Sequence, residues 1–167
     1  MSKTGTGERG MREPLLQIRD LVVSFDSPHG STEAVRKVSF DVAAGEIVGI
    51  VGESGSGKSV TCRAVLGLLP QTATVAGSIR FENQELAGLD DDALRQLRGE
   101  RISMIFQNPS SHLDPLMKIG QQVSEPLIHH EGARPADARK AAIEGLREVK
   151  LDHAAQRADN YPHQLSG

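Results

Sequence analysis

The sequence contains little cysteine, few aromatic residues and no excess of positive charge. Its single cysteine, Cys62, cannot form a disulfide within the chain, excludes a cysteine-rich zinc site and fits a reducing compartment. Aromatic residues make up 3% of the 167 residues, so a core must be built mainly from Leu, Ile, Val and Ala. The net charge of −3 gives no electrostatic support for nucleic acid as a partner. No apolar run approaches the length of a membrane-spanning helix.

The remaining composition and its patterning predict a globular protein that mixes strands and helices. Hydrophobic residues make up 38% of the chain, whereas residues 1–14 are polar, glycine-rich and predicted to form a flexible tail. The patterns indicate strands at 15–25, 38–42, 46–51, 77–82 and 101–106, and helices at 62–69, 90–98, 119–127 and 135–149. The first two strands are expected to pair in an antiparallel layer.

Two of these segments carry more detailed expectations. The continuous apolar run EIVGIV at 46–51 is typical of a central strand covered on both faces. In the following helix, one buried face is expected, which ends before Pro70; its members are Cys62, Val65, Leu66 and Leu69. Cys62 is interpreted as a small buried hydrophobic residue, with a position near a bound ligand as the alternative.

A glycine-rich cluster lies between that strand and that helix. The segment GESGSGKS at 52–59 matches G-x-x-x-x-G-K-[ST] through Gly52, Gly57, Lys58 and Ser59. Glycines let successive backbone N–H groups point at an anion, and the helix that begins near Lys58 adds its positive end. Lys58 can reach the β- and γ-phosphates, and the Ser59 hydroxyl can bind Mg²⁺. The position of the cluster favours a phosphate-binding loop over a chance glycine-rich turn.

Residues 52–60 are therefore predicted to bind a nucleotide; they are Gly52, Glu53, Ser54, Gly55, Ser56, Gly57, Lys58, Ser59 and Val60. ATPases, GTPases and small kinases share such a loop. The guanine-specific sequence N-K-x-D is missing, which favours ATP.

Three segments together resemble a known family. With GESGSGKS at 52–59, RISMIFQNP at 101–109 and YPHQLSG at 161–167, the chain resembles the ATP-binding subunits of ABC transporters. It is most similar to the dipeptide, oligopeptide and nickel importer branch. The resemblance implies an α/β P-loop NTPase of ABC type, with an antiparallel β layer, a mixed or parallel core sheet and a helical subdomain. Residues 15–106 would form the ATP-binding core, and residues 107–167 the Q-loop and helical subdomain.

The resemblance also implies cofactors, partners and a location. The cofactors would be ATP and Mg²⁺. The partners would be transmembrane permease subunits, a second ATP-binding subunit and, indirectly, an extracytoplasmic solute-binding protein, with no nucleic acid. The protein would lie at the cytoplasmic face of the inner membrane as a peripheral subunit. It would couple ATP hydrolysis to import of peptides or a related small solute; the alternatives are an ATP-binding fragment without hydrolysis and a non-transport ABC ATPase.

Residue roles follow from the resemblance only where positions match. Lys58 and Gln107 would be catalytic, with the Gln107 amide near Mg²⁺ and the attacking water; the alternative for Gln107 is a polar residue at a strand end. Phe25 would stack on adenine, or is an ordinary core residue. The start of the signature motif, which would contact ATP on the opposite subunit, comprises Leu165, Ser166 and Gly167.

Some parts of the family pattern do not match. The loop differs from the importer branch at Asn108, Ser111, His112 and Asp114, so no solute preference is inferred from it. An acid that follows an apolar strand, which a P-loop hydrolase uses to hold Mg²⁺, is missing after Ser59. We therefore expect this chain to be the N-terminal part of a longer protein that ends within the signature motif.

Overall fold

The computed structural model describes residues 13–28 and 30–165. By their internal contacts, the residues form two compact units, Met1–Arg95 and Gln96–Gly167, which are described separately below. Most of the predicted tail at 1–14, together with Ser166 and Gly167, lies outside the described residues.

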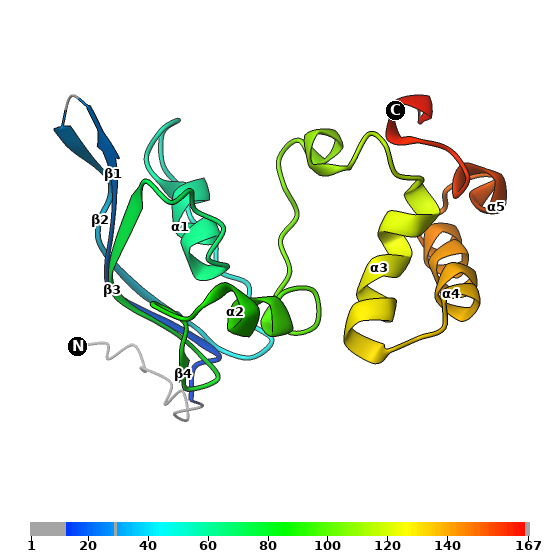
Figure 1. Cartoon of the computed structure of the whole chain (residues 1–167). Helices are drawn as coiled ribbons and strands as arrows, with labels where there is room; N and C mark the ends of the chain where they lie inside the picture. Colours follow the sequence, from blue (N-terminus) through cyan, green and yellow to red (C-terminus); the bar gives the residue numbers. More distant parts are fainter. Residues whose placement is uncertain (1–12, 29, 166–167) are drawn as a thin grey trace, which may run out of the picture. The chain divides into compact units, whose positions relative to one another are not determined.

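The first unit contains an antiparallel sheet, which Figure 1 shows at the blue-to-green end of the chain. Its strands are β1 (Leu16–Ser27), β2 (Gly30–Val42), β3 (Ala73–Phe81) and β4 (Gln84–Glu85), in the order β2-β1-β3-β4. The side chains that are almost fully buried come from β1 and β3: Ile18, Leu21, Val23 and Ile79. The predicted antiparallel pairing of the first two strands is confirmed, and both strands are longer than expected.

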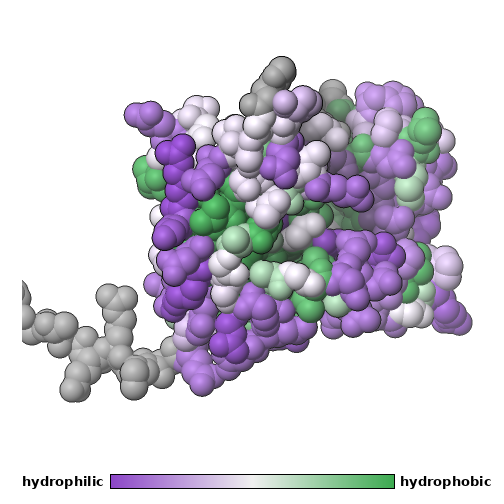
Figure 2. All heavy atoms as spheres, turned by 60° about the vertical axis from the view of Figure 1, so that its left-hand side comes forward, coloured by the Kyte–Doolittle hydropathy of each residue, from purple (hydrophilic) through white to green (hydrophobic). Residues whose placement is uncertain are grey.

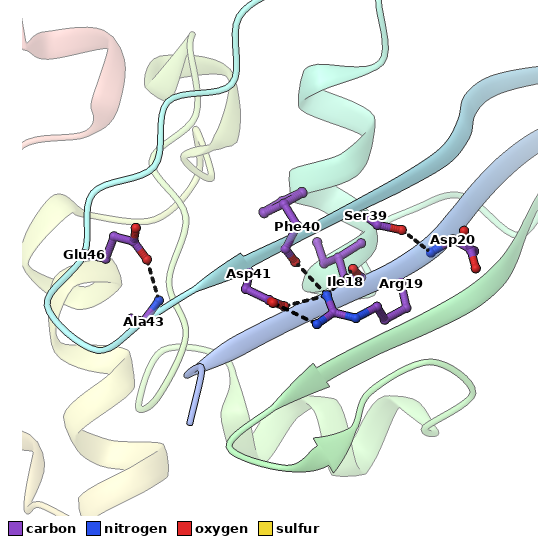
Figure 3. Close-up of polar contacts among 8 residues, drawn as sticks. All are labelled: Ile18, Arg19, Asp20, Ser39, Phe40, Asp41, Ala43 and Glu46. Carbon is purple, nitrogen blue, oxygen red and sulfur yellow. Dashed lines mark hydrogen bonds and ion pairs between the residues drawn. The ribbon is translucent and has the colours of Figure 1, made fainter. Parts of the chain in front are cut away.

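Strand β1 is interrupted at Asp20, where the backbone enters the left-handed region with φ 46° and the pairing register shifts. Gly77 of β3 lies opposite this point. A residue with a Cβ would not fit there, because the Cβ would lie 2.6 Å from the Arg19 carbonyl oxygen. The Arg19 guanidinium forms a fork to Asp41 of β2, at 2.5 and 2.8 Å, and the Asp20 N–H donates to the Ser39 hydroxyl (Figure 3). The Ser39 hydroxyl thus satisfies the Asp20 N–H at the irregularity, and the Arg19–Asp41 pair links β1 to β2 beside it.

Helix α1 (Lys58–Val65) follows the glycine cluster and packs on β1 and β2. The predicted buried face is wrong in part: Cys62 is exposed, and the helix buries Thr61 and Ala64 instead. The helix also ends earlier than expected, because Gly67 adopts a left-handed φ of 61° just after its last turn. A second short helix, α2 (Asp91–Leu97), agrees with the predicted helix at 90–98.

The second unit is helical. Its elements are η1 (Pro109–His112), α3 (Ile119–Glu131), α4 (Pro135–Glu148), α5 (Ala154–Arg157) and η2 (Pro162–Gln164). Helices α3 and α4 pack against each other, and Ala138 and Ala142 of α4 are almost fully buried. Ala158, which follows α5, is also buried. A Cβ at Gly120 would lie 3.0 Å from the Ala158 Cβ.

Two predicted strands are not strands in the structure. Segments 46–51 and 101–106 have no regular secondary structure apart from one isolated bridge between Arg98 and Ile102. Ile47, Val51 and Ile105 are 98%, 96% and 94% exposed. An extended segment forms a strand only when a neighbour accepts and donates its backbone hydrogen bonds. Apart from the bridge at Ile102, neither segment has such a neighbour within the described part of its unit.

The surface therefore includes apolar side chains as well as polar ones, as the green and purple residues in Figure 2 show. Among residues 13–28 and 30–165, no helix is both long enough and apolar enough to cross a bilayer.

Candidate functional site

The glycine cluster forms a turn whose shape depends on two glycines. Gly55 and Gly57 have φ values of 81° and 87°, in the left-handed region that L residues with a side chain rarely adopt. Gly57 also meets a steric limit, because a Cβ there would collide with the Ala34 carbonyl oxygen and lie 3.2 Å from Val35 Cγ2. Gly55 faces open space. Thus β2 determines which residue can occupy position 57.

The ammonium of Lys58 lies inside the curve of this turn. Its Nζ donates to the carbonyl oxygens of Gly52 and Glu53, both at 2.7 Å, and to the Ser56 hydroxyl at 3.3 Å. These three bonds hold a positive charge at the centre of the loop. An anion that enters the loop meets that charge directly.

Helix α1 begins at the same point and leaves its first N–H groups available. Its N-cap residue is Gly57, which has no capping side chain, and the first turn contains no acidic residue. The first N–H groups of a helix have no carbonyl partner within the helix, and the helix dipole places partial positive charge there. The exposed Ser59 belongs to this turn. The arrangement is suited to a phosphate group.

Thr61 is a site residue that the sequence pattern did not indicate. Its buried hydroxyl donates to the Gly57 carbonyl oxygen at 3.0 Å, and its backbone N–H donates to the same oxygen at 2.8 Å. Both bonds fix the residue whose φ turns the chain into the helix. The predicted buried face of this helix began at Cys62, so Thr61 lay outside it and its role became visible only in the structure, where the helix starts at Lys58 and buries Thr61.

Phe25 lies near the end of β1, in the same unit as the loop. It is half-buried, pairs with Thr32 and Ala73, and lies on the same face of β1 as the buried Val23. Val23 pairs with Val35, the residue that limits space at Gly57. These contacts are compatible with both interpretations of Phe25, an adenine-stacking ring and a core residue.

Gln107 and Leu165 belong to the second unit. Gln107 is exposed and follows segment 101–106 directly, just before η1. Leu165 is half-buried, and its N–H donates to the Pro162 carbonyl oxygen at 3.1 Å. The structure thus places residues 52–57 in one loop and residues 58–60 in the first turn of α1. The shared magnesium site of Ser59 and Gln107 stays a prediction. Among the described residues, no group of three or more His, Cys, Asp or Glu side chains could hold a metal ion.

A cavity of about 270 Å³ also occurs in the first unit, but it is separate from this loop. It is lined mainly by apolar residues, among them Ala64, Leu69, Val75, Ile79 and Leu86, and by none of residues 52–60. A triphosphate would find no N–H array and no cation there, so the loop is the better candidate for anion binding.

Comparison with known proteins identifies the family. The family model described as ABC transporter matches residues 35–167. The chain belongs to the ABC transporter family. Two solved structures support the fold: the ATP-binding cassette MJ0796 in a dimeric post-hydrolysis state with ADP and Pi, and a dimeric structure of the same cassette. Their TM-scores are 0.75 and 0.76, and both are 29% identical to this chain. The matches cover 90% and 91% of this chain and 63% of each matched chain. The predicted family and the α/β fold class of ABC type are confirmed. The expected mixed or parallel core sheet does not form among residues 13–28 and 30–165, whose one sheet is antiparallel.

Curated relatives agree with the predicted branch. The chain is 42% identical, over its whole length, to the oligopeptide transport ATP-binding protein OppD of Salmonella typhimurium, of which it covers 50%. It is 43% identical over 93% of its length to the dipeptide transport ATP-binding protein DppD of Lactococcus lactis, of which it covers 45%. The chain therefore spans about half the length of the curated relatives that it matches.

Proposed function

We propose that this protein binds ATP with Mg²⁺ and uses its hydrolysis to drive the import of peptides or a related small solute. The observation that carries the proposal is the loop at 52–57, which surrounds the Lys58 ammonium and leads into an uncapped helix. A loop with an inward cation, free helical N–H groups and no room for a side chain at Gly57 fits the phosphates of a nucleotide.

The residues divide the binding work by their chemistry. Lys58 holds negative charge on the β- and γ-phosphates, and the N–H groups of the first turn of α1 bind phosphate oxygens. Ser59 and Gln107 offer oxygen atoms, the type of ligand that Mg²⁺ prefers, and the Gln107 amide would also orient the attacking water. Mg²⁺ held by these residues would neutralise charge on the phosphates. Phe25 provides a flat apolar face for adenine.

The peptide solute, the partners and the location are proposed from the relatives. OppD and DppD are named for oligopeptide and dipeptide transport, which supports a peptide solute for this chain. The dimeric cassettes support pairing with a second ATP-binding subunit, whose nucleotide Leu165, Ser166 and Gly167 would contact. The protein would then work at the cytoplasmic face of the membrane with permease subunits, supplied by a solute-binding protein.

The test of ATP binding is calorimetry with Mg-ATP on the whole gene product. We expect Lys58→Ala to weaken binding about tenfold or more, because a charge-assisted contact to phosphate is lost. Lys140→Ala is the matched control, since Lys140 is an exposed lysine of α4 outside the loop, and should bind as the wild type does. Equal affinity of the wild type and Lys58→Ala would contradict the proposal.

A second measurement separates transport from binding alone. Phosphate release by the gene product, reconstituted with its permease in liposomes, should rise when peptide and solute-binding protein are present. Tight Mg-ATP binding with no phosphate release would instead support the alternative of a non-hydrolysing binding module.

A further inference from the structure

The rings of Phe106 and His112 form a stacked pair in the loop that contains Gln107. Their centroids are 3.7 Å apart, and the ring planes differ by 10°. Phe106 is the residue directly before Gln107, so this contact holds one side of the glutamine backbone. Offset or parallel stacking of this kind restricts the rotation of both rings.

The edge of the same imidazole reaches the other side of Gln107. His112 Nδ1 lies 3.0 Å from the carbonyl oxygen of Asn108, the residue directly after Gln107. A carbonyl oxygen only accepts, so this bond forms when Nδ1 carries the proton. The Ser111 hydroxyl donates to the same oxygen at 2.8 Å and lies 3.1 Å from Nδ1. One side chain thus contacts both neighbours of Gln107.

The short helix η1 explains how His112 comes back to this position. Pro109 occupies the first helical position, and the Ser111 N–H donates to the Asn108 carbonyl oxygen at 3.3 Å. The turn reverses the chain within a few residues, which places residue 112 beside residues 106 and 108. Gln107 itself is exposed, and its side chain has no hydrogen-bond partner within the described residues.

We propose that His112 is a positioning residue for Gln107, which it holds by stacking on Phe106 and by bonding to the Asn108 carbonyl. The proposal rests on the proposed role of Gln107 at Mg²⁺ and water. A glutamine side chain has three rotatable bonds, so its amide can adopt many positions. A fixed backbone limits these positions. A backbone held on both sides reduces the reorganisation needed when the amide takes part in the reaction.

The two contacts can be removed separately. His112→Phe keeps the stacked ring and removes the donor, whereas His112→Asn keeps a donor near the Nδ1 position and removes the ring. His112→Ala removes both. His129→Ala is the matched control, because His129 is an exposed histidine of α3 in the same unit and lies outside the loop.

The first test is structural and needs no enzyme activity. NMR relaxation on the whole gene product should give a rigid Gln107 backbone N–H, with an order parameter of about 0.85, in the wild type and in His129→Ala. In His112→Ala the order parameter should fall toward about 0.6, and the two partial variants should lie between. An unchanged order parameter in His112→Ala would overturn the proposal, whatever the protein does with ATP.

The second test is kinetic and uses the complex with its permease. We expect His112→Ala to lower kcat about five- to tenfold, the size of one lost hydrogen bond and one lost stacking contact, with KM for ATP within about twofold. Because His112 acts through Gln107, adding His112→Ala to Gln107→Ala should cause no further loss. Additive losses would show that His112 acts independently of Gln107 and would overturn the proposal.

Failure of the proposed function would give a different result. If the wild type neither binds nor hydrolyses Mg-ATP, both the proposed function and the positioning role of His112 are wrong. If the wild type hydrolyses ATP and His112→Ala is equally active, only the positioning role is wrong.

Discussion

Replacing Gly57 by alanine introduces two energetic costs in the glycine-rich loop at 52–57: the strain of the left-handed backbone and the collision with β2. At φ 87° an L residue with a side chain is strained by about 1–2 kcal/mol, and the lower backbone freedom of alanine in the unfolded chain offsets part of this. The added Cβ would also collide with the Ala34 carbonyl oxygen, and overpacking of this kind costs about 1–3 kcal/mol. The free energy of unfolding should therefore fall by about 2–4 kcal/mol.

Two glycines nearby serve as matched controls. Gly55 has a similar φ of 81° but open space around it, so Gly55→Ala should cost only the backbone strain, about 1 kcal/mol. Gly49 has open space and no left-handed φ, so Gly49→Ala should stay within about 0.5 kcal/mol of the wild type. The series thus isolates the close approach of β2.

The assay is urea unfolding of the whole gene product and its three variants, paired with calorimetry of Mg-ATP. We expect the unfolding midpoints to fall in the order Gly49→Ala, Gly55→Ala, Gly57→Ala, and Gly57→Ala to lose nucleotide affinity because its N-cap is displaced. If Gly57→Ala were as stable as Gly55→Ala, the contact between the loop and Ala34 would not limit this position, and the steric argument would be refuted.

Two smaller predictions concern hydrogen bonds in the first unit. Burial of Glu85 opposes its ionisation, but bonds from the Ser78 hydroxyl and two backbone N–H groups outweigh it and lower its pKa from the usual 4.5. Its charge therefore stabilises the fold above pH 4.5, and Glu85→Gln should lower the free energy of unfolding by less than about 1 kcal/mol at pH 7. The difference in unfolding free energy between the wild type and this variant should shrink as the pH falls below 4.5. A difference that stays the same between pH 7 and pH 3 would contradict this prediction. Thr61→Val removes the bond to the Gly57 carbonyl oxygen at nearly constant shape and should cost about 1 kcal/mol in urea unfolding, with weaker Mg-ATP binding; unchanged binding would show that this bond does not hold the loop.

Features that depend on neighbouring residues in the chain were predictable. The spacing of Gly52, Gly57, Lys58 and Ser59 predicted a loop that leads into a helix, because glycine freedom and helix initiation are local properties. The acids at the start of α2 and Pro135 at the start of α4 likewise marked helix beginnings. The alternation of Val38, Phe40 and Val42 indicated a strand, and its separation from strand 15–25 by a short loop indicated that the two form an antiparallel pair.

Burial and strand formation in several segments did not follow the local pattern. Segment 46–51 has the composition of a buried strand but is exposed, since a strand requires partners that composition cannot supply. Cys62 fits an apolar helical face by spacing, yet α1 packs on the sheet through Thr61 and Ala64. The direction in which a helix faces depends on the surface that it meets, and β1 and β2 provide that surface.

The order of residues along the chain was thus enough to locate the glycine-rich loop at 52–57 and to indicate the family to which the chain belongs. Three further features could be seen only in the folded structure: the lack of space for a side chain at Gly57, the bulge of β1 against Gly77, and the contacts of His112 with both neighbours of Gln107. Each arises from atoms that only folding brings together, such as a carbonyl of β2 against the loop or an imidazole against a ring six residues earlier. Contacts of this kind follow no periodicity and no motif, so sequence patterns cannot predict them.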